Sequence, residues 1–266
     1  MSLGPQAQKN LEGKTILITG ASAGIGEAIA REFVDATGGN IKLVLAARRV
    51  RRLAELGQQL GQSGAQVHLA SLDVSDGANI DEFFASLPSE FQDIDVLVNN
   101  AGKALGIEHA GSIRDEDVEE MFATNVLGLI KMTQTVIRGM KEKNSGDIVQ
   151  LGSIAGIESY PGGSIYCATK SAVRSFTQAV RKELINTKIR VMEIDPGAVE
   201  TEFSLVRFGG DPEKAKKVYE GYEPLSAKDI AEVVVFNCSR RQNVVVAESL
   251  VFPTAQAGSY HRYRAQ

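Results

Sequence analysis

Residues 14–36 constrain the fold more than any other part of the sequence. The apolar run Thr-Ile-Leu-Ile within residues 14–19 predicts a buried strand, and the turn Gly20-Ala-Ser-Ala-Gly24-Ile-Gly26 follows it and begins a helical pattern over residues 27–36. A glycine turn between a strand and a helix is a phosphate-binding arrangement, because glycine allows close backbone approach and the helix N-terminus favours negative charge. The spacing Gly-x-x-x-Gly-x-Gly differs from the common Gly-x-Gly-x-x-Gly. Tight packing of the turn alone is the alternative interpretation.

The alternation of strand and helix continues through the chain. Apolar runs predict further strands at residues 41–47, 65–72, 94–98, 147–151, 190–194 and 244–252. Helical patterns occur at residues 51–60, 79–87, 115–141, 212–221 and 227–238, and another helix is expected after Gly162-Gly163. This order predicts an α/β protein with a Rossmann-type, doubly wound parallel sheet of about seven strands and helices on both faces. A single domain over residues 1–266 is the simplest division, since no segment resembles a linker.

Composition narrows the function classes. The 266 residues carry a net charge of −4 with a pI near 5.6, which provides no electrostatic footprint for nucleic acid. No run approaches the roughly 20 apolar residues of a membrane span, and residues 1–12 lack the apolar stretch of a signal peptide. We therefore expect a cytoplasmic protein without a membrane partner. Cys167 and Cys238 lack metal-ligand spacing with the three histidines, so no metal is expected.

Two arginines follow the second predicted strand, where an NAD-preferring site usually carries an acidic residue. Arg48 and Arg49 can pair with a ribose 2′-phosphate through charge-assisted hydrogen bonds, and no carboxylate stands at positions 46–49 to repel it. The sequence therefore predicts NADP(H) rather than NAD(H). The alternative is that both side chains only solvate the start of the next helix.

Polar residues follow the third and fourth predicted strands, at the edge where ligands collect in parallel sheets. Asp73 is placed to bond an adenine amino group or, alternatively, to cap the helix predicted at residues 79–87. The sequence Asn99-Asn100-Ala101-Gly102 suits either close packing around a ligand or a simple turn. Asn125 lies in an apolar part of a predicted helix, where a buried amide requires hydrogen-bond partners, and a structural role would satisfy that need.

Tyr166 and Lys170 are four residues apart, a spacing that places both side chains on one face of a helix. A phenol has an ordinary pKa of about 10, and a nearby ammonium group stabilises the phenolate and lowers that pKa. We interpret Tyr166 as an acid/base candidate and Lys170 as the group that tunes its pKa. The spacing alone also fits an ordinary solvated helix face.

Together these motifs resemble the short-chain dehydrogenase/reductase family over almost the whole chain. The matching pieces, in order, are Thr19-Gly20-Ala-Ser-Ala-Gly24-Ile-Gly26, Asp73, Asn99-Asn100-Ala101-Gly102, Asn125, Ser153, Tyr166-x-x-x-Lys170 and Pro196-Gly197. The longer phrases Gly152-Ser-Ile-Ala-Gly156 and Thr201-Glu-Phe-Ser-Leu-Val-Arg207 are similar to the NADP-dependent 3-hydroxy acid (serine) dehydrogenases within that family. Asp195 departs from the small or amide residue common at its position in the wider family.

The resemblance implies catalytic roles for four residues. Tyr166 would exchange a proton with the substrate oxygen, and Ser153 would hydrogen-bond the same oxygen. Lys170 would hold the nicotinamide ribose and lower the pKa of Tyr166. Asn125 would anchor a water that links Lys170 to solvent.

The resemblance also implies a set of cofactor contacts. Asp73 would lie at the adenine and Asn100 near the adjacent ribose, while Val199 and Thr201 would bind the nicotinamide carboxamide. The full implied set is Gly20, Ser22, Gly24, Ile25, Gly26, Arg48, Arg49, Asp73, Asn100, Gly102, Tyr166, Lys170, Pro196, Gly197, Val199 and Thr201.

The functional hypothesis is hydride transfer between NADP(H) and the hydroxyl-bearing carbon of a small 3-hydroxy acid, such as serine, allo-threonine or 3-hydroxyisobutyrate. A broad NADPH-dependent aldehyde or ketone reductase is the alternative, with the same catalytic residues. A cation for the substrate carboxylate separates the two, and Arg207 is the candidate, although a solvated loop arginine also fits. A non-catalytic NADP(H) sensor is disfavoured, because the full catalytic set is present.

Two expectations concern the end of the chain. Residues 203–222 follow the implied nicotinamide-binding segment and are rich in glycine and charge, so we expect a lid over the substrate. The resemblance implies a homotetramer with the long central helices and residues 252–266 at interfaces. Tyr260 and Tyr263 are consistent with docking onto a neighbouring subunit.

Overall fold

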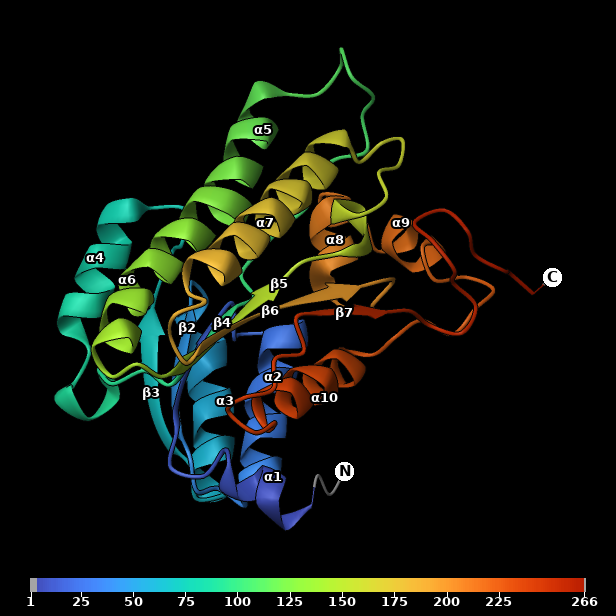
Figure 1. Cartoon of the computed structure of the whole chain (residues 1–266). Coiled ribbons are helices and arrows are strands. Elements are labelled where there is room, and N and C mark those ends of the chain that lie inside the picture. The colour runs from blue at the N-terminus through green and yellow to red at the C-terminus, as the bar shows by residue number, and fades with distance from the viewer. Residues whose placement is uncertain (1–3, 266) are drawn as a thin grey trace.

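A parallel sheet lies at the centre of the computed structural model, which describes residues 4–265 (Figure 1). Its strands are β1 (Thr15–Thr19), β2 (Lys42–Ala47), β3 (Gln66–Ser71), β4 (Val96–Asn99), β5 (Gly146–Leu151), β6 (Ile189–Pro196) and β7 (Glu248–Val251). Their order is β3-β2-β1-β4-β5-β6-β7, and each pairing is parallel. The strand order reverses between β1 and β4, and ligands of open α/β sheets bind beyond the carboxyl ends of the strands at such a switch point.

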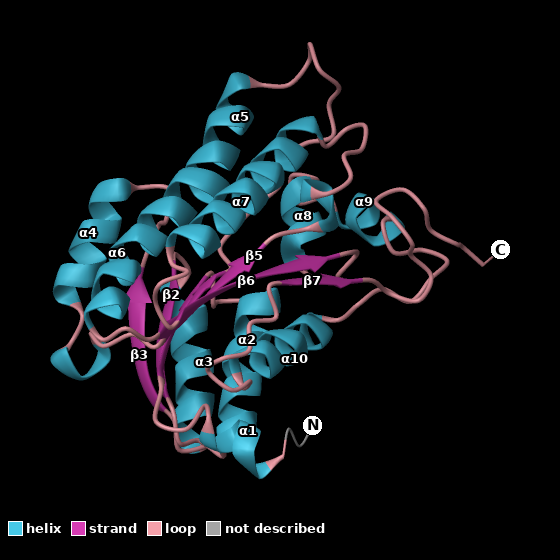
Figure 2. Cartoon of the chain, viewed as in Figure 1, coloured by secondary structure: helices cyan, strands magenta, loops and turns pink. Residues whose placement is uncertain are grey.

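Helices cover both faces of the sheet, as Figure 2 shows. Helices α4, α6 and α7 pack on one face, and α2, α3 and α10 pack on the other. The α-helices are α1 (Pro5–Lys9), α2 (Gly24–Thr37), α3 (Val50–Gln62), α4 (Gly77–Ser86), α5 (Asp115–Phe122), α6 (Leu129–Glu142), α7 (Ser164–Glu183), α8 (Glu202–Arg207), α9 (Pro212–Lys217) and α10 (Ala227–Cys238). The predicted doubly wound sheet of about seven strands is confirmed. Across residues 4–265, none of the helices has both the length and the apolar character needed to traverse a membrane.

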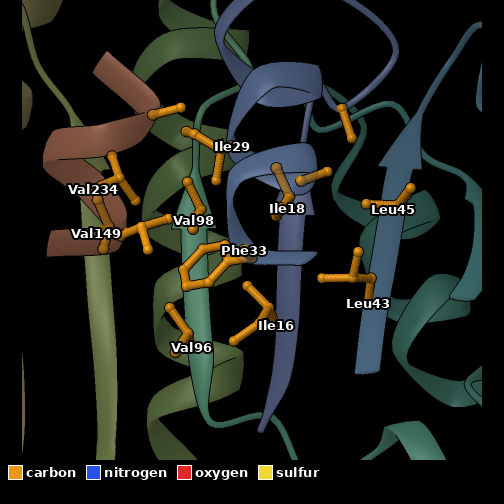
Figure 3. Packing of buried hydrophobic residues seen from close by; sticks show 14 of the residues in the cluster. Ile16, Ile18, Ile29, Phe33, Leu43, Leu45, Val96, Val98, Val149 and Val234 are labelled. Carbon is orange, nitrogen blue, oxygen red and sulfur yellow. The ribbon is translucent and has the colours of Figure 1, made fainter. Parts of the chain in front are cut away.

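The strands are buried on both faces, which explains their continuous apolar sequence. In β1, the side chains of Ile16 and Ile18 belong to the core beneath α2, while Leu17 between them belongs to the core on the opposite face. Figure 3 shows Phe33 of α2 packed over Ile16 and Val96 of the sheet. The sheet is therefore a rigid support, and the residues that follow its strands are held in fixed positions.

The long helix predicted at residues 115–141 is interrupted. Helix α5 ends at Phe122, a π-helical segment η2 (Ala123–Gly128) follows, and α6 begins at Leu129. Gly128 permits a close approach there, because a Cβ atom at this position would lie 2.1 Å from the carbonyl oxygen of Val74. The wider π turn re-aims side chains within one helix axis, and such turns occur frequently at functional sites.

Several predicted boundaries were wrong in the last third of the chain. The last strand is Glu248–Val251 rather than residues 244–252, because Val244 lies in a turn and its carbonyl oxygen accepts a hydrogen bond from the buried guanidinium of Arg190. Helix α9 ends at Lys217, before the predicted end at residue 221. Helices α1 and α8 were not predicted, since five and six residues are too few to show a helical period.

Candidate active site

A cavity of about 1110 Å³ opens beyond the carboxyl ends of the strands, at the switch point. This volume exceeds the roughly 300–1,000 Å³ of a typical small-molecule pocket, so it suits a dinucleotide together with a second small molecule. All predicted site residues line it except Gly26 and Asn125. Those lining it are Gly20, Ser22, Gly24, Ile25, Arg48, Arg49, Asp73, Asn100, Gly102, Ser153, Tyr166, Lys170, Pro196, Gly197, Val199, Thr201 and Arg207.

The glycine turn after β1 combines the two properties expected of it. Gly24 has a φ of +58°, and a Cβ atom at Gly26 would lie 2.6 Å from the carbonyl oxygen of Gly20, so the turn requires glycine. Ala23 occupies the N-cap of α2, and no side chain caps the first N–H groups of this 14-residue helix. The turn therefore packs tightly and also presents an uncapped helix N-terminus to the cavity, which fits a pyrophosphate.

Asn100 secures this turn to the neighbouring strand. Its amide nitrogen donates to the carbonyl oxygens of Thr19 (2.9 Å) and Gly20 (3.2 Å), and its backbone N–H donates to the Thr19 hydroxyl (3.1 Å). The Asn100 side chain thus holds the ends of β1 and β4 together, a structural task at the wall of the cavity.

Asp73 is organised by its own loop. Its carboxylate accepts hydrogen bonds from the Ser75 backbone (3.0 Å) and hydroxyl (2.6 Å) and lies 3.6 Å from Arg48. Although burial opposes the change, the bonds from Ser75 and the charge of Arg48 lower the pKa of Asp73. The capping alternative for Asp73 was wrong, because Asp76 accepts the bonds from the first turn of α4. Asp73 remains available at the cavity as an acceptor.

Arg49 bridges the glycine turn and the first residue of α8, directly before the segment predicted to be a lid. Its Nε donates to the Ser22 hydroxyl (3.2 Å), and its Nη1 pairs with Glu202 of α8 at 2.7 Å. Arg52 shares the same carboxylate at 2.7 Å. Arg49 therefore does more than solvate the start of α3, whereas Arg48 is 61% exposed beside Asp73. Both arginines follow β2 and line the cavity.

Tyr166, Lys170 and Ser153 meet on the opposite wall. Tyr166 and Lys170 lie on one face of α7, and the Lys170 Nζ is 5.8 Å from the centre of the Tyr166 ring. The ammonium group is buried and donates to the carbonyl oxygen of Leu151 at 2.6 Å, which fixes it at the end of β5. The Ser153 hydroxyl accepts a hydrogen bond from the backbone of Ala155 at 3.1 Å and keeps its own proton free to donate.

Burial has the largest effect on the pKa values of Tyr166 and Lys170. It raises the pKa of Tyr166 above the ordinary value, Tyr160 raises it further, and hydrogen bonding with Ser153 opposes the change. Burial also lowers the pKa of Lys170 to about 8, while Asp195 and Glu193 oppose this shift. The pKa of Tyr166 is therefore raised overall, because desolvation of the phenolate is the larger effect, and a lowering contribution from Lys170 stays a prediction. Tyr166 is therefore a protonated phenol at neutral pH.

Asn125 lies in the π-helical segment η2 and has the partners that its burial requires. Its Oδ1 accepts from the Lys103 backbone N–H (2.9 Å), and its Nδ2 donates to the Lys103 carbonyl (2.8 Å) and the Thr169 hydroxyl (3.1 Å). A Cβ atom at Gly102 would lie 3.3 Å from this Oδ1 and 3.8 Å from the Lys170 Nζ. Asn125 thus fixes the backbone next to Lys170, and its role in holding a water stays a prediction.

Arg207 lies at the end of α8 and reaches two loops across the cavity. It donates to the Tyr160 hydroxyl (2.8 Å) and to the carbonyl oxygens of Gly162 (2.7 Å) and Gly106 (3.3 Å). It is therefore not a solvated loop arginine. Its three bonds use three of the five guanidinium N–H groups, and two remain for another acceptor.

Two aromatic residues beside Tyr166 were not named as site residues from the sequence, although Phe203 lies within the predicted lid. The Phe203 ring centre lies 5.5 Å from that of Tyr166, and the Tyr160 hydroxyl receives the Arg207 bond. Both line the cavity. Phe203 follows the implied cofactor segment by two residues and offered a weak signal, whereas Tyr160 lies in a loop whose course depends on the tertiary structure.

The C-terminal tail folds back onto the same chain. The Arg264 guanidinium donates to the carbonyl oxygens of Lys217 (3.3 Å) and Val218 (3.2 Å) at the end of α9. Tyr260 lines the cavity, so the tail contributes to the site of its own chain. Tyr260 and Tyr263 nevertheless remain 67% and 74% exposed. Their predicted docking onto a neighbouring subunit stays a prediction.

The fold and the cavity define a class of protein: a dinucleotide-binding oxidoreductase with an uncapped helix N-terminus on one wall and a serine, tyrosine and lysine on the other. Within residues 4–265, no three His, Cys, Asp or Glu side chains are grouped to hold a metal ion. A family model described as short chain dehydrogenase matches residues 14–207, and the chain belongs to this family.

Three similar proteins add detail. A protein of Schizosaccharomyces pombe named NADP-dependent 3-hydroxy acid dehydrogenase is 54% identical over 96% of this chain and 98% of that protein. A protein of Chromohalobacter salexigens named sulfoacetaldehyde reductase 2 is 41% identical over 92% of this chain and 96% of its own length. The solved closed form of serine dehydrogenase complexed with NADP+ superposes with a TM-score of 0.87, at 42% identity, over 94% of this chain and 99% of that one.

Proposed function

We propose that the protein transfers a hydride between NADP(H) and the hydroxyl-bearing carbon of a small 3-hydroxy acid of the serine, allo-threonine or 3-hydroxyisobutyrate type. The observation that carries this proposal is Arg207, whose guanidinium keeps two N–H donors for an anion and is close enough to lower the pKa of Tyr166. A carboxylate on Arg207 and a hydroxyl near Tyr166 are the two ends of a 3-hydroxy acid. The names of the relatives support the same substrate class.

The residues around the cavity fit NADP(H). The pyrophosphate would lie on the uncapped N-terminus of α2, with Ser22 and Ile25 in the turn. Arg48 and Arg49 would hold the 2′-phosphate, since a phosphate accepts bidentate bonds from guanidinium groups. Asp73 would accept from the adenine. The remaining proposed contacts follow β4 and β6 and are Asn100, Gly102, Pro196, Gly197, Val199 and Thr201.

The proton chemistry belongs to the protein. The nicotinamide supplies or accepts the hydride when it is bound. Tyr166, held as a phenol by its buried surroundings, donates its proton to the oxygen of the carbonyl substrate and becomes a phenolate; in the oxidation direction, the phenolate takes the proton of the substrate hydroxyl. Ser153 donates a hydrogen bond to that oxygen. Lys170, with Asn125 beside it, holds a positive charge below pH 8 and supports the ribose end of the cofactor.

The anion subsite extends beyond carboxylates. Sulfoacetaldehyde, named for one relative, carries its anionic group one methylene away from the carbonyl carbon, as the oxidised form of a 3-hydroxy acid does. The two remaining N–H groups of Arg207 suit either anion, because both offer oxygen acceptors in a plane or tripod. This shared spacing supports an anion at the Arg207 end of the substrate.

Further parts of the proposal concern the whole chain. Residues 203–222, which contain α9 and all of α8 except Glu202, act as the substrate lid within the single domain over residues 1–266. The protein is a cytoplasmic homotetramer. The exposed Leu250 of the edge strand β7 and the exposed Tyr260 and Tyr263 support an assembly, and sedimentation analysis tests it.

The decisive experiment follows NADP+ reduction at the nicotinamide absorbance. The panel contains L- and D-serine, allo-threonine, 3-hydroxyisobutyrate and simple secondary alcohols, with NAD+ as the control. We expect activity confined to 3-hydroxy acids and NADP+. Activity only with NADPH on uncharged carbonyls would replace this proposal with a general carbonyl reductase, a function that the protonated state of Tyr166 also favours.

A further inference from the structure

Asp195 lies directly beneath the catalytic loop, although the chemistry described above does not use it. It is 1% exposed at the end of β6, and its Oδ1 accepts the backbone N–H of Ser153 at 3.0 Å. A Cβ atom at Gly152 would lie 2.1 Å from the same oxygen, so the carboxylate contacts the loop backbone without an intervening side chain. The position of Ser153 therefore depends on Asp195.

The charged groups around Asp195 are unevenly solvated. Arg174 of α7 lies 3.5 Å from its Oδ2 and binds Glu248 of β7 at 2.6 Å on the outer side. Lys170 of α7 donates to the carbonyl oxygen of Leu151, one residue before the Gly152 that Asp195 contacts, and the charge of Asp195 favours the charged form of Lys170. Asp195 is thus the negative group between a surface arginine and the buried lysine of the site.

Glu193 has a different state. It is fully buried, and both of its carboxylate oxygens lack hydrogen-bond partners among the described residues. Burial and the charge of Asp195 raise the pKa of Glu193, so this carboxyl group holds a proton at neutral pH. Burial raises the pKa of Asp195 to about 6, but the Ser153 N–H and Arg174 oppose this rise, so Asp195 is the ionised member of the pair at neutral pH.

We propose that Asp195 is a positioning residue for the reaction: its carboxylate fixes the Ser153 backbone and places a negative charge beside the short segment that holds the Lys170 ammonium group. This proposal rests on the catalytic roles of Ser153 and Lys170 in the proposed function. Arg174 holds the carboxylate in place from the outer side. Asp195 would thus help to hold the Ser153 hydroxyl and the Lys170 ammonium group in position without touching the substrate itself.

The test compares Asp195→Asn with Glu248→Gln. The asparagine retains an acceptor for the Ser153 N–H and removes the charge, whereas the control removes a charge from the far side of Arg174. For Asp195→Asn we expect kcat to fall about 10-fold at pH 8 with little change in the KM for NADP+. In the pH profile of kcat/KM, the limb that reports Lys170 should move to lower pH in Asp195→Asn. In Asp195→Glu, which keeps the charge, this limb should return toward its position in the unaltered protein.

A second measurement separates this proposal from the proposed function. The reactivity of Lys170 toward acetic anhydride, followed by mass spectrometry against pH, reports its protonation in the protein without substrate. The midpoint should fall in Asp195→Asn and stay unchanged in Glu248→Gln, whatever substrate the enzyme uses. An unchanged midpoint and kcat in a folded Asp195→Asn variant, or an equal shift in Glu248→Gln, overturns the proposal.

Discussion

Arg49 and Glu202 form an ion pair at 2.7 Å that joins the end of β2 to the first turn of α8. Arg52 completes the cluster at 2.7 Å from the same carboxylate, and the bonds from both arginines lower the pKa of Glu202. The guanidinium group assigned to the 2′-phosphate is therefore oriented by Glu202, the residue directly before the proposed lid. Because Arg49 serves both the cofactor and this segment, we expect cofactor binding and the position of the lid to be coupled.

This geometry predicts the effect of removing Arg49. The variant Arg49→Ala should raise the Kd for NADP+ by about 10-fold or more, because a charge-assisted contact to the 2′-phosphate is lost. Binding of NAD+, which lacks this phosphate, should change little.

Arg48→Asp should weaken NADP+ binding and raise relative NAD+ use. Fluorescence titration with both cofactors measures the effect, and Arg51→Ala, at a 94% exposed side chain that pairs with Glu55, is the matched control. Equal losses for NADP+ and NAD+ would remove the specificity assignment.

Tyr166→Phe tests the proton donor. The variant removes the phenol hydroxyl and keeps the ring that packs near Phe203, so NADP+ binding should stay nearly intact while turnover is abolished. Tyr160→Phe removes a hydroxyl from the same cavity but breaks only a bond to Arg207. It should weaken substrate binding and retain turnover. Stopped-flow and steady-state assays separate the two effects, and retained activity in Tyr166→Phe would displace this residue as the acid/base.

Arg207→Ala tests the anion subsite. We expect the KM for 3-hydroxy acids to rise at least 10-fold, because a charge-assisted bond to the substrate carboxylate is worth about 1.5–3 kcal/mol. The corresponding methyl esters carry no charge, so their KM should rise much less. Arg240→Ala, which removes an arginine stacked 4.0 Å from the Phe236 ring centre, controls for the loss of positive charge. Parallel losses for acids and esters would show that Arg207 only holds the loops together.

Glu193 makes a prediction about stability and pH. Its folded pKa is raised above the ordinary value of 4.5, so the folded state binds the proton more tightly than the unfolded state. This contribution to stability is complete below pH 4.5 and is lost as the pH rises through the window above it. Glu193→Gln should therefore flatten the decline in the free energy of unfolding between pH 5 and pH 8. Urea unfolding measures it across that range.

Glu248 is the control for this prediction, because its pKa shift has the opposite sign. The pKa of Glu248 is lowered: burial opposes the change, but the bonds from Arg174 and Gln178 outweigh it. Its contribution is present above pH 4.5 and is lost on acidification. An unaltered slope in Glu193→Gln would mean that this carboxyl group is ionised in the folded protein.

The parts of the site that follow strands were predictable from the sequence. A buried parallel strand produces a continuous apolar run, and its carboxyl end places the next residues at the ligand edge, which is how Gly20, Arg49 and Asp73 were placed. Side chains brought in from loops were not predictable. Tyr160 lines the cavity, where Arg207 of α8 binds it across a sequence separation of 47 residues.

The pKa shifts of the site residues could not be predicted from the sequence either. A spacing of four residues correctly placed Tyr166 and Lys170 on one helix face, but it contained no information on desolvation. Burial raises the pKa of Tyr166 and lowers the pKa of Lys170. Asp195 and Glu193, which oppose the shift of Lys170, lie on β6 and are brought close by the tertiary structure. Local patterns predict which groups meet, whereas the packing of the whole sheet determines their charge states.

The cavity is lined by residues that follow all seven strands, from β1 to β7. No fragment of the chain contains this set, so a ligand that fills the cavity recognises only the assembled sheet. Its binding energy then adds to the free energy of unfolding of the entire domain, by about 2.7 kcal/mol at a ligand concentration 100 times its Kd. The concentration of nucleotide around the protein would thus set its lifetime against proteolysis as well as its rate of turnover.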